Sequence, residues 1–239
     1  MRFNRSTYSH QVHAYIVGLI RDGELPAGAS VKESLVAERL GISRAPVREA
    51  LQDLLHKGLL TSEPQKGKAV RSLTPQEIED SYAVGGILEA VGVSESLPRW
   101  SQSDLAALHA MVERLRERCG TSACKGFFPE FDDSFHASLL QHCENRRLVE
   151  MARISCASIS KVLLYRQWLD AFTLEEFCER HTAIAAAMAS RDAPAVARVL
   201  REHYLEVGRR LVAVCPGAQA PAGQHPGPAG EMRGRCGVP

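Results

Sequence analysis

The stretch ESLVAERLGISRAPVREAL at residues 33–51 decides the fold of the N-terminal part of the chain. It contains two short amphipathic segments that are separated only by the tripeptide Gly41-Ile42-Ser43. Ser30 and Glu33 form a predicted capping box for the first segment, and Ser43 is the predicted N-cap of the second, which ends at Gly58. A turn this short holds two helices at a steep angle, so the stretch predicts a helix-turn-helix.

The second of these helices carries residues suited to DNA at its N-terminal end. The residues predicted to face outward are Ser43, Arg44, Ala45 and Arg48. An arginine guanidinium can bind guanine O6 and N7, or a phosphate, through two parallel hydrogen bonds, and the free N–H groups of a helix N-terminus favour phosphate oxygens. On an isolated helix these residues would indicate only a solvated face. Because they directly follow a tight turn, we predict a recognition helix.

Two flanking segments complete the predicted N-terminal domain. Apolar residues at helical spacing predict a first helix that stops at Asp22-Gly23. After the helix-turn-helix, residues 59–61 and 69–71 are predicted to form a small β-hairpin. Its tip carries Lys66, Gly67 and Lys68, which suit a wing that contacts the minor groove or the DNA backbone. Residues 1–73 are therefore predicted to form a winged helix-turn-helix domain.

The rest of the chain is predicted to be helical, which makes the fold class mainly α. N-cap signals mark three helix starts: Thr74 with Glu77, Thr173 with Glu176, and Asp192. We expect a second domain at residues 74–214, an antiparallel bundle of six helices at about 75–97, 102–118, 124–142, 145–170, 174–190 and 193–214. Residues 215–239 are rich in Pro and Gly and are expected to form a disordered tail.

The charge of the chain is unevenly distributed. Residues 1–72 hold 11 Lys/Arg against 7 Asp/Glu, whereas residues 73–215 hold 16 against 20. A basic head on an acidic body suggests that the head binds a polyanion. No secretory signal opens the chain, no apolar run approaches the length of a membrane span, and the 7 cysteines are scattered. We therefore expect a cytoplasmic protein without a membrane partner.

Four candidate metal ligands lie on three of the predicted body helices: Asp132, His136, His181 and His203. Asp132 and His136 are four residues apart and therefore share a helix face. The short loop between the last two helices would bring His181 and His203 to one level. One carboxylate and three imidazoles suit a divalent transition metal such as Zn, Ni, Fe or Mn, with positions left open for a ligand. Spacing alone also allows a hydrogen-bonded polar core without metal.

The chain resembles a known family of regulators. Residues 11–72 look like the winged helix-turn-helix head of GntR-superfamily bacterial transcription regulators, through the run SRAPVREAL at residues 43–51 and the following Gly58-Leu59. The body resembles the FCD effector domain of the FadR-type branch, through the motifs Asp132-x-x-Phe135-His136-x-x-Leu139, His181-x-x-Ile184 and His203. Six helices place it closer to the VanR-like group. The resemblance implies that the four ligands hold a metal, which in turn coordinates a small carboxylate effector.

Two positions depart from the family pattern. Ser34 stands where several members carry a DNA-contacting arginine, so the operator sequence is left open. Gly85, followed by Gly86, stands where many members carry an arginine that grips the effector carboxylate. We therefore expect either an effector other than a simple dicarboxylate or another effector-binding cation, Arg153 or Arg166, with the two glycines leaving extra room over the metal.

Together these patterns predict a ligand-responsive, DNA-binding transcription regulator that represses a metabolic operon, and not an enzyme. One head contacts only a few base pairs, so we expect a homodimer on a palindromic double-stranded operator. Effector binding in the body would change the placement of the two heads. Two alternatives stay open: a regulator that responds to the metal without an organic effector, and a metal-dependent hydrolase fused to a DNA-binding head.

Overall fold

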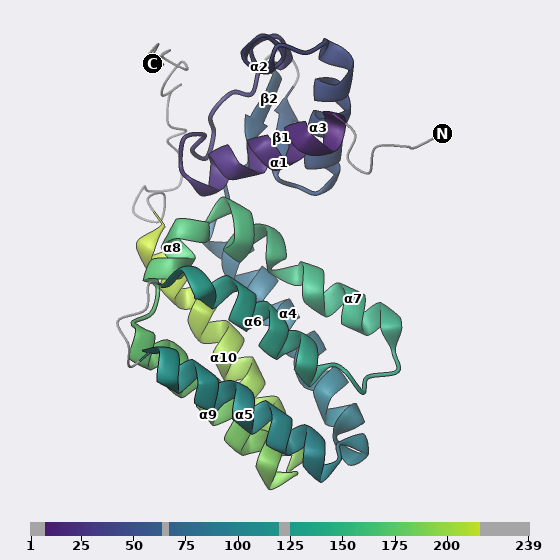
Figure 1. The fold of residues 1–239 in the computed structure, drawn as a ribbon, viewed down its shortest axis with the longest axis vertical. Coiled ribbons are helices and arrows are strands. Elements are labelled where there is room, and N and C mark those ends of the chain that lie inside the picture. The colour runs from purple at the N-terminus through teal and green to yellow at the C-terminus, as the bar shows by residue number, and fades with distance from the viewer. Residues whose placement is uncertain (1–7, 64–66, 120–124, 216–239) are drawn as a thin grey trace. The chain divides into compact units, whose positions relative to one another are not determined.

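The structure is a computed structural model that describes residues 8–63, 67–119 and 125–215. The chain divides into two compact units between Leu73 and Thr74. We call residues 8–73 the head and residues 74–215 the body, and each is described by itself. Figure 1 shows helices and a small hairpin in the head and helices in the body. The predicted disordered tail lies, from residue 216 onward, outside the described residues.

The head is a winged helix-turn-helix, as predicted. Its helices are α1 (Tyr8–Arg21), α2 (Glu33–Leu40) and α3 (Arg44–His56), and they are followed by the antiparallel strands β1 (Leu60–Glu63) and β2 (Gly67–Val70). Apolar side chains from α1 and α3 meet in one core, where the fully buried residues include Ile16, Val47, Leu51 and Leu54. This core anchors α3, the predicted recognition helix, on α1.

Gly41 makes the tight turn between α2 and α3. Its φ of 63° lies in the left-handed region that glycine adopts without strain, and its N–H donates to the Glu38 carbonyl at 3.2 Å. Helix α3 begins directly after Ser43, whose backbone is extended but whose side chain makes no capping hydrogen bond. The first N–H groups of α3 are therefore not satisfied by a side-chain cap.

The predicted capping box of Ser30 and Glu33 is wrong. The N-cap of α2 is Lys32, and its side chain makes no capping hydrogen bond. Ser30 instead forms an antiparallel bridge with Ala69 on β2, and the adjacent Val31 N–H donates to the Lys68 carbonyl at 2.8 Å. The segment before α2 is thus held by the wing strand, and Ser30 pairs with that strand and does not cap the helix.

The wing has the strand pairing that the sequence indicates. Leu60 lies opposite Val70 and Thr61 opposite Ala69, and the Leu60 and Val70 side chains are buried. Gly67 begins β2 with a φ of 82°, again in the left-handed region. Residues 64–66 at the tip, including the predicted DNA contact Lys66, lie outside the described residues.

The described part of the body contains seven α-helices: α4 (Pro75–Ser96), α5 (Gln102–Cys119), α6 (Phe128–Leu139), α7 (Arg146–Ser155), α8 (Tyr165–Asp170), α9 (Leu174–Ser190) and α10 (Ala193–Val214). Both predicted capping boxes are complete, and the Asp192 side chain accepts a hydrogen bond from the Ala195 N–H. The body core includes the fully buried side chains Phe135, Leu139, Ile184, Met188 and Leu200. Among the described helices, none is both long and apolar enough to cross a bilayer.

The fourth predicted helix, residues 145–170, is interrupted. Helix α7 ends at Ser155, a π-helical segment follows at Ile159–Leu163, and α8 comes after it. The Cys156 carbonyl accepts hydrogen bonds from both the N–H and the hydroxyl of Ser160, at 3.0 and 3.1 Å. A serine hydroxyl that bonds the carbonyl four residues back slightly destabilises and often bends a helix. The break widens the helix where the chain lines a cavity, which is typical of π segments.

The third predicted helix is shorter than expected. The range 124–142 becomes a 3-10 turn at Lys125–Phe127 followed by α6, which ends at Leu139. Pro129 stands in the first turn of α6, a position that proline favours because its missing N–H needs no partner there. All six predicted ranges therefore contain helix, and the differences lie at one internal break and at helix ends.

Gly85 and Gly86 allow α4 to approach α10. A Cβ on Gly85 would lie 2.9 Å from Cys156 Sγ and 3.0 Å from Tyr204 Cε1, and one on Gly86 would lie 2.8 Å from Tyr204 Cβ. The expectation that these glycines leave room over the metal is wrong, because the Tyr204 ring fills that space. Their function in the fold is close helix packing.

Candidate nucleic-acid interface and metal centre

The N-terminal end of α3 presents the predicted DNA-facing residues to solvent. The exposed residues are Ser43, Arg44, Ala45 and Arg48. From the described part of the wing, Gly67 is exposed and Lys68 is partly exposed. Because no side chain caps α3, its free backbone N–H groups lie among these side chains and can bind phosphate oxygens.

Glu33 on α2 binds Arg48 on α3. Arg48 Nη2 and Nε donate to the two oxygens of the Glu33 carboxylate, at 2.9 and 3.3 Å. This hydrogen bond is the main cause that lowers the pKa of Glu33, and the nearby charges of Lys68 and Arg44 act in the same direction. Glu33 therefore lies among three of the predicted DNA-binding cations. Sequence reasoning assigned Glu33 to a cap and missed this contact, since Arg48 lies 15 residues further along the chain.

The four predicted metal ligands converge in the body. Asp132 and His136 come from α6, His181 from α9 and His203 from α10. One donor atom of each lies within 4.8 Å of the others. His181 and His203 are buried, whereas Asp132 and His136 are partly exposed. A carboxylate and three imidazoles at this spacing match the ligand set that divalent transition metals take.

Two of the imidazoles each form a hydrogen bond through Nδ1, and this places their Nε2 atoms towards Asp132. His181 Nδ1 donates to the Phe177 carbonyl at 2.7 Å, and its Nε2 lies 3.4 Å from Asp132 Oδ1 without hydrogen-bond geometry. His136 Nδ1 donates to Glu89 at 2.8 Å, and its Nε2 lies 3.7 Å from the same oxygen. An outer hydrogen bond of this kind fixes the tautomer and orientation of metal-binding histidines.

Burial and charge set the protonation of the cluster. Burial lowers the pKa of His181 and places that of His203 well below the usual 6.5, so both rings are neutral. Burial has the same effect on His136, but the carboxylates of Glu89 and Asp132 outweigh it and raise the pKa of His136 to about 9. Burial raises the pKa of Asp132, but the nearby charges of His136, His181 and Lys161 outweigh burial, so the pKa of Asp132 is lowered. A metal would replace the proton on His136.

Two buried nitrogens of the cluster lack hydrogen-bond partners among the described residues, His181 Nε2 and His203 Nδ1. A buried polar atom without a partner destabilises a protein, so such atoms usually mark a bound water, ion or ligand. Neutral imidazole nitrogens beside an ionised carboxylate fit a divalent transition metal better than a hard oxygen-seeking cation. The residues present therefore fit the predicted metal.

Glu89 is the residue of this site that sequence reasoning did not assign a role. It is 1 % exposed on α4 and holds His136. Its position in the sequence could have indicated this role. Glu89 follows Tyr82 and Gly85 on the buried face of α4, where a carboxylate requires a partner. Helix α4, which carries none of the four candidate ligands, thus contributes to the candidate metal centre.

A cavity of about 640 Å³ opens beside the cluster, a size that suits a small metabolite. The cluster residues that line it are Asp132, His136 and His203. Helices α4 and α10 contribute Tyr82, Glu89 and Tyr204, and the wall from α7 and the π segment includes Arg146, Arg153, Ser160 and Lys161. The cavity therefore combines candidate metal ligands, tyrosine hydroxyls and cations.

The predicted effector-binding residues do not all reach this cavity. Arg153 lines it, whereas Gly85 and Arg166 are not part of its lining. Arg146 and Arg153 are seven residues apart on α7 and so lie on one face of the helix. Neither guanidinium has an ion-pair partner among the described residues, whereas Lys161 pairs with Asp133. Two unpaired guanidinium groups at a cavity suit an anionic ligand group.

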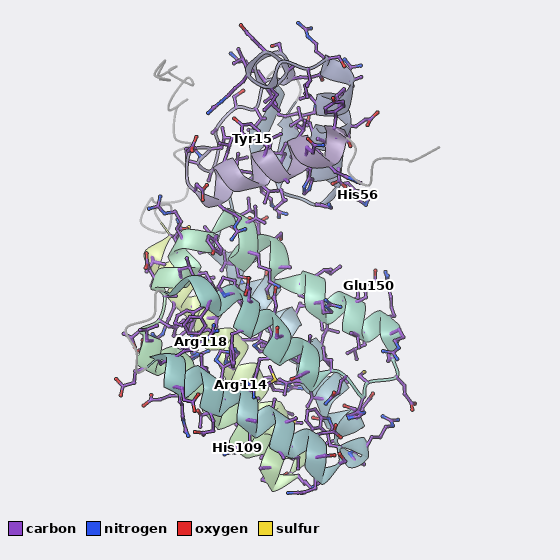
Figure 2. The ribbon with its side chains drawn as sticks, in the orientation of Figure 1. Tyr15, His56, His109, Arg114, Arg118 and Glu150 are labelled. Carbon is purple, nitrogen blue, oxygen red and sulfur yellow. The ribbon has the colours of Figure 1, made fainter. Side chains whose placement is uncertain are left out.

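Arg147, which is adjacent to Arg146 on α7, does have a carboxylate partner. Arg147 Nη1 donates to Glu150, which Figure 2 labels on the same helix, at 2.8 Å. Arg147 is not among the residues that line the cavity. The arginines that face the cavity are thus distinguished from their neighbour by the lack of a carboxylate partner.

Two family models match the sequence. Residues 8–70 match the model described as bacterial regulatory proteins, gntR family, and residues 80–206 match the FCD domain. This chain belongs to the GntR family and carries an FCD domain. The FCD match includes all four candidate metal ligands, and the GntR match includes α3 and the two strands of the wing. The match does not separate the FadR-type branch or the VanR-like group, so those assignments stay predictions. The described body has seven α-helices, because the fourth predicted helix is interrupted, and not the six on which the VanR-like assignment was based.

Relatives of this GntR-family chain carry the names of regulators. The "Probable D-xylose utilization operon transcriptional repressor" of Paenarthrobacter nicotinovorans is 26 % identical over 205 residues, which cover 84 % of this chain and 88 % of that protein. The "HTH-type transcriptional repressor GlaR" of Escherichia coli (strain K12) is 28 % identical over 193 residues, with 77 % and 86 % covered. The prediction of a DNA-binding transcription regulator, and not an enzyme, is confirmed.

Solved structures share the fold of this GntR-family chain. A putative GntR transcriptional regulator from Rhodococcus sp. RHA1 has a TM-score of 0.64 at 21 % identity, covering 87 % of this chain and 99 % of that chain. E. coli McbR/YncC has a TM-score of 0.62 at 21 % identity, with 88 % and 97 % covered. At these identities the likeness concerns the fold alone.

Proposed function

We propose that this GntR-family regulator represses a metabolic operon and responds to a small-molecule effector bound at a metal site in its FCD body. The observation that carries the proposal is the convergence of four donor atoms within 4.8 Å beside a cavity of about 640 Å³. The names of the relatives support repression, and one of them is named for an operon of sugar utilisation.

The head binds its operator through the N-terminal end of α3 and through the wing. Arg44 and Arg48 supply the guanidinium groups for base edges or phosphates, with Ser43 and Ala45 beside them. The wing residues Lys66, Gly67 and Lys68 contact the neighbouring groove or backbone. Two heads of a homodimer read the two halves of a palindrome, because one head alone contacts too few base pairs.

The candidate metal site is held by Asp132, His136, His181 and His203. When bound, a divalent transition metal such as Zn, Ni, Fe or Mn supplies open coordination positions for oxygen or nitrogen atoms of the effector. The Phe177 carbonyl and Glu89 orient the imidazoles of His181 and His136. The unpartnered nitrogens of His181 and His203 support this assignment.

The effector occupies the cavity beside the metal site. Arg153, together with Arg146, provides the cationic contact that Gly85 lacks, which favours an effector with a carboxylate or another anionic group. Tyr82 and Tyr204 line the same cavity and offer hydroxyl groups to the polar remainder of the molecule. Trp168 also lines it and provides a fluorescent reporter of binding.

The test uses the full chain and an operator selected from a random duplex library. Operator affinity is measured by fluorescence anisotropy with the metal removed, with Zn²⁺ restored, and with a panel of hydroxyacids and dicarboxylates. We expect one or more acids to change both Trp168 fluorescence and operator affinity, and Arg153→Ala to weaken that response. Arg44→Ala should abolish preference for the operator over random duplex.

Other outcomes separate the alternatives. Operator affinity that follows Zn²⁺ with no effect of any acid would favour a regulator that responds to the metal alone. Metal analysis of the wild type beside His181→Ala and His203→Ala tests the site itself. If none of the three proteins binds metal, the four residues are a polar core, and the metal-site proposal is wrong.

A further inference from the structure

We propose that Glu33 is a positioning residue for DNA recognition, which holds the Arg48 guanidinium so that its outer edge faces DNA. The inference rests on the proposed contact of Arg48 with the operator. Glu33 lies on α2 and Arg48 on α3, so the contact joins the two helices of the helix-turn-helix. An acidic residue in a DNA-binding surface would otherwise oppose binding, because it repels phosphates.

The atoms involved determine which part of Arg48 stays available. Nε and Nη2 donate to Glu33 Oε2 and Oε1, at 3.3 and 2.9 Å, so the carboxylate binds the side of the guanidinium. A guanidinium has five N–H donors. The two N–H groups of Nη1 and the second one of Nη2 are not used by Glu33. One N–H of Nη1 and the remaining N–H of Nη2 form the end of the fork, which binds guanine O6 and N7 or two phosphate oxygens.

Glu33 and Arg48 differ in how far their side chains are exposed to solvent. The Glu33 side chain is 22 % exposed and the Arg48 side chain 63 % exposed, so the carboxylate is the sheltered member and the guanidinium reaches into solvent. A long arginine side chain loses rotamer entropy when DNA binding orders it, and a contact that already holds it in the free protein reduces that loss. Arg48 is thus ordered before DNA arrives.

The negative charge of Glu33 also favours the arrangement of the cations around it. Its carboxylate interacts with the charges of Arg48, Lys68 and Arg44. These three cations would repel one another without a shared anion between them. Arg44, by contrast, has no side-chain hydrogen bond or ion pair within residues 8–63, 67–119 and 125–215. One recognition arginine is therefore held in place and the other is free to adapt.

The test compares Glu33→Gln with Glu38→Gln in the full chain. Glu38 is exposed on the same helix, and its side chain has no ion pair with a described residue, so both variants remove one negative charge. Affinity is measured by fluorescence anisotropy for the selected operator and for random duplex, with circular dichroism and Tm as checks of folding. If charge alone matters, both variants bind every DNA as tightly as the wild type or more tightly.

We expect Glu33→Gln to weaken operator binding about tenfold despite the lost negative charge, whereas Glu38→Gln does not. In an Arg48→Ala background, Glu33→Gln should cause no further loss, an outcome that a purely structural effect would not give. A loss confined to the operator assigns Arg48 to a base edge, and an equal loss on random duplex assigns it to phosphate. Both outcomes support a positioning role for Glu33.

Two outcomes overturn the inference and can be told apart. If Arg48→Ala loses operator affinity but Glu33→Gln binds as tightly as the wild type, Glu33 does not position Arg48. If Arg48→Ala also binds like the wild type, the proposed DNA contact of Arg48 is wrong, and the role of Glu33 is wrong with it.

Discussion

The carboxylate of Glu89 on α4 accepts a hydrogen bond from Nδ1 of His136 on α6, with 2.8 Å between Oε2 and that nitrogen. Both groups belong to the cluster around Asp132, since His136 Nε2 lies 3.7 Å from Asp132 Oδ1. A buried carboxylate that holds an imidazole in one orientation determines which nitrogen faces the centre. The packing of α4 is therefore linked to the geometry of the candidate metal site.

Glu89→Gln should weaken Zn²⁺ binding about 10- to 100-fold, because an amide holds the imidazole less firmly than a carboxylate does. Isothermal titration of the metal-free protein with zinc chloride measures the effect. Glu95→Gln, an exposed position on the same helix, is the matched control and should bind like the wild type. Equal affinities for the two variants would show that Glu89 does not orient the ligand.

Removal of the metal should lower the thermal stability of the body. A ligand that binds only the folded state stabilises it by about 2.7 kcal/mol when its concentration is 100 times Kd. We expect Zn²⁺ to raise the Tm of the wild type, and His181→Ala and His203→Ala to lose this response, as measured by scanning calorimetry with and without EDTA. His109→Ala is the control, since His109 on α5 (Figure 2) has a side chain that is 70 % exposed.

Lys68→Ala should weaken binding to all DNA and reduce the slope of log affinity against log salt by about 1, because one phosphate contact is lost. The same result is expected for Lys66→Ala. The slope is measured by anisotropy from about 50 to 200 mM salt. Lys57→Ala serves as the control, because Lys57 at the C-terminal end of α3 pairs with Asp53 at 2.8 Å. An unchanged slope for Lys68→Ala would place that lysine away from the DNA backbone.

Gly86→Ala should destabilise the body by about 1–3 kcal/mol, although alanine favours helices more than glycine does. The added Cβ would lie 2.8 Å from Tyr204 Cβ, and the Arg201 backbone 3.4 Å away limits relief. Urea unfolding followed by tryptophan fluorescence reports on the body, which contains both tryptophans, Trp100 and Trp168. Val84→Ala, 49 % exposed on the same helix, should change stability by less than about 0.5 kcal/mol. A stable Gly86→Ala variant would contradict the close packing of α4 on α10.

Glu176→Gln should lower the Tm at neutral pH but not in strong acid. The hydrogen bond from Arg210 is the largest cause that holds the pKa of Glu176 at about 2, below its usual 4.5. A pKa that is lower in the folded state stabilises the fold above pH 4.5, and this contribution is lost as the pH falls towards 2. The difference in Tm between the two proteins should therefore shrink between these pH values. Glutamine can still cap α9, so a difference that stays constant with pH would implicate the cap instead.

The sequence predicted the four ligands of the candidate metal site, but it did not predict their surroundings. Asp132 and His136 share a helix face by their spacing, and the loop before Asp192 indicated that His181 and His203 face each other; the structure places all four donors within 4.8 Å. Glu89 was not predictable as the partner of His136, because the two residues are 47 positions apart. The space expected at Gly85 depended on a neighbour, Tyr204, that no local pattern specifies.

The sequence by itself determined the features whose interacting groups lie within a few residues. The turn at Gly41 and the capping boxes of Thr74 and Thr173 follow from the conformational freedom of glycine and from side chains that reach only the next helical turn. Where a polar side chain had several possible partners, the tertiary structure determined which one it binds. Glu33 binds Arg48, 15 residues away on α3, in place of a local cap, and Glu89 binds His136, 47 residues away on α6. A polar group binds the partner that folding brings nearest. When the possible partners lie far apart in the sequence, only the packing of the folded chain determines which of them is nearest.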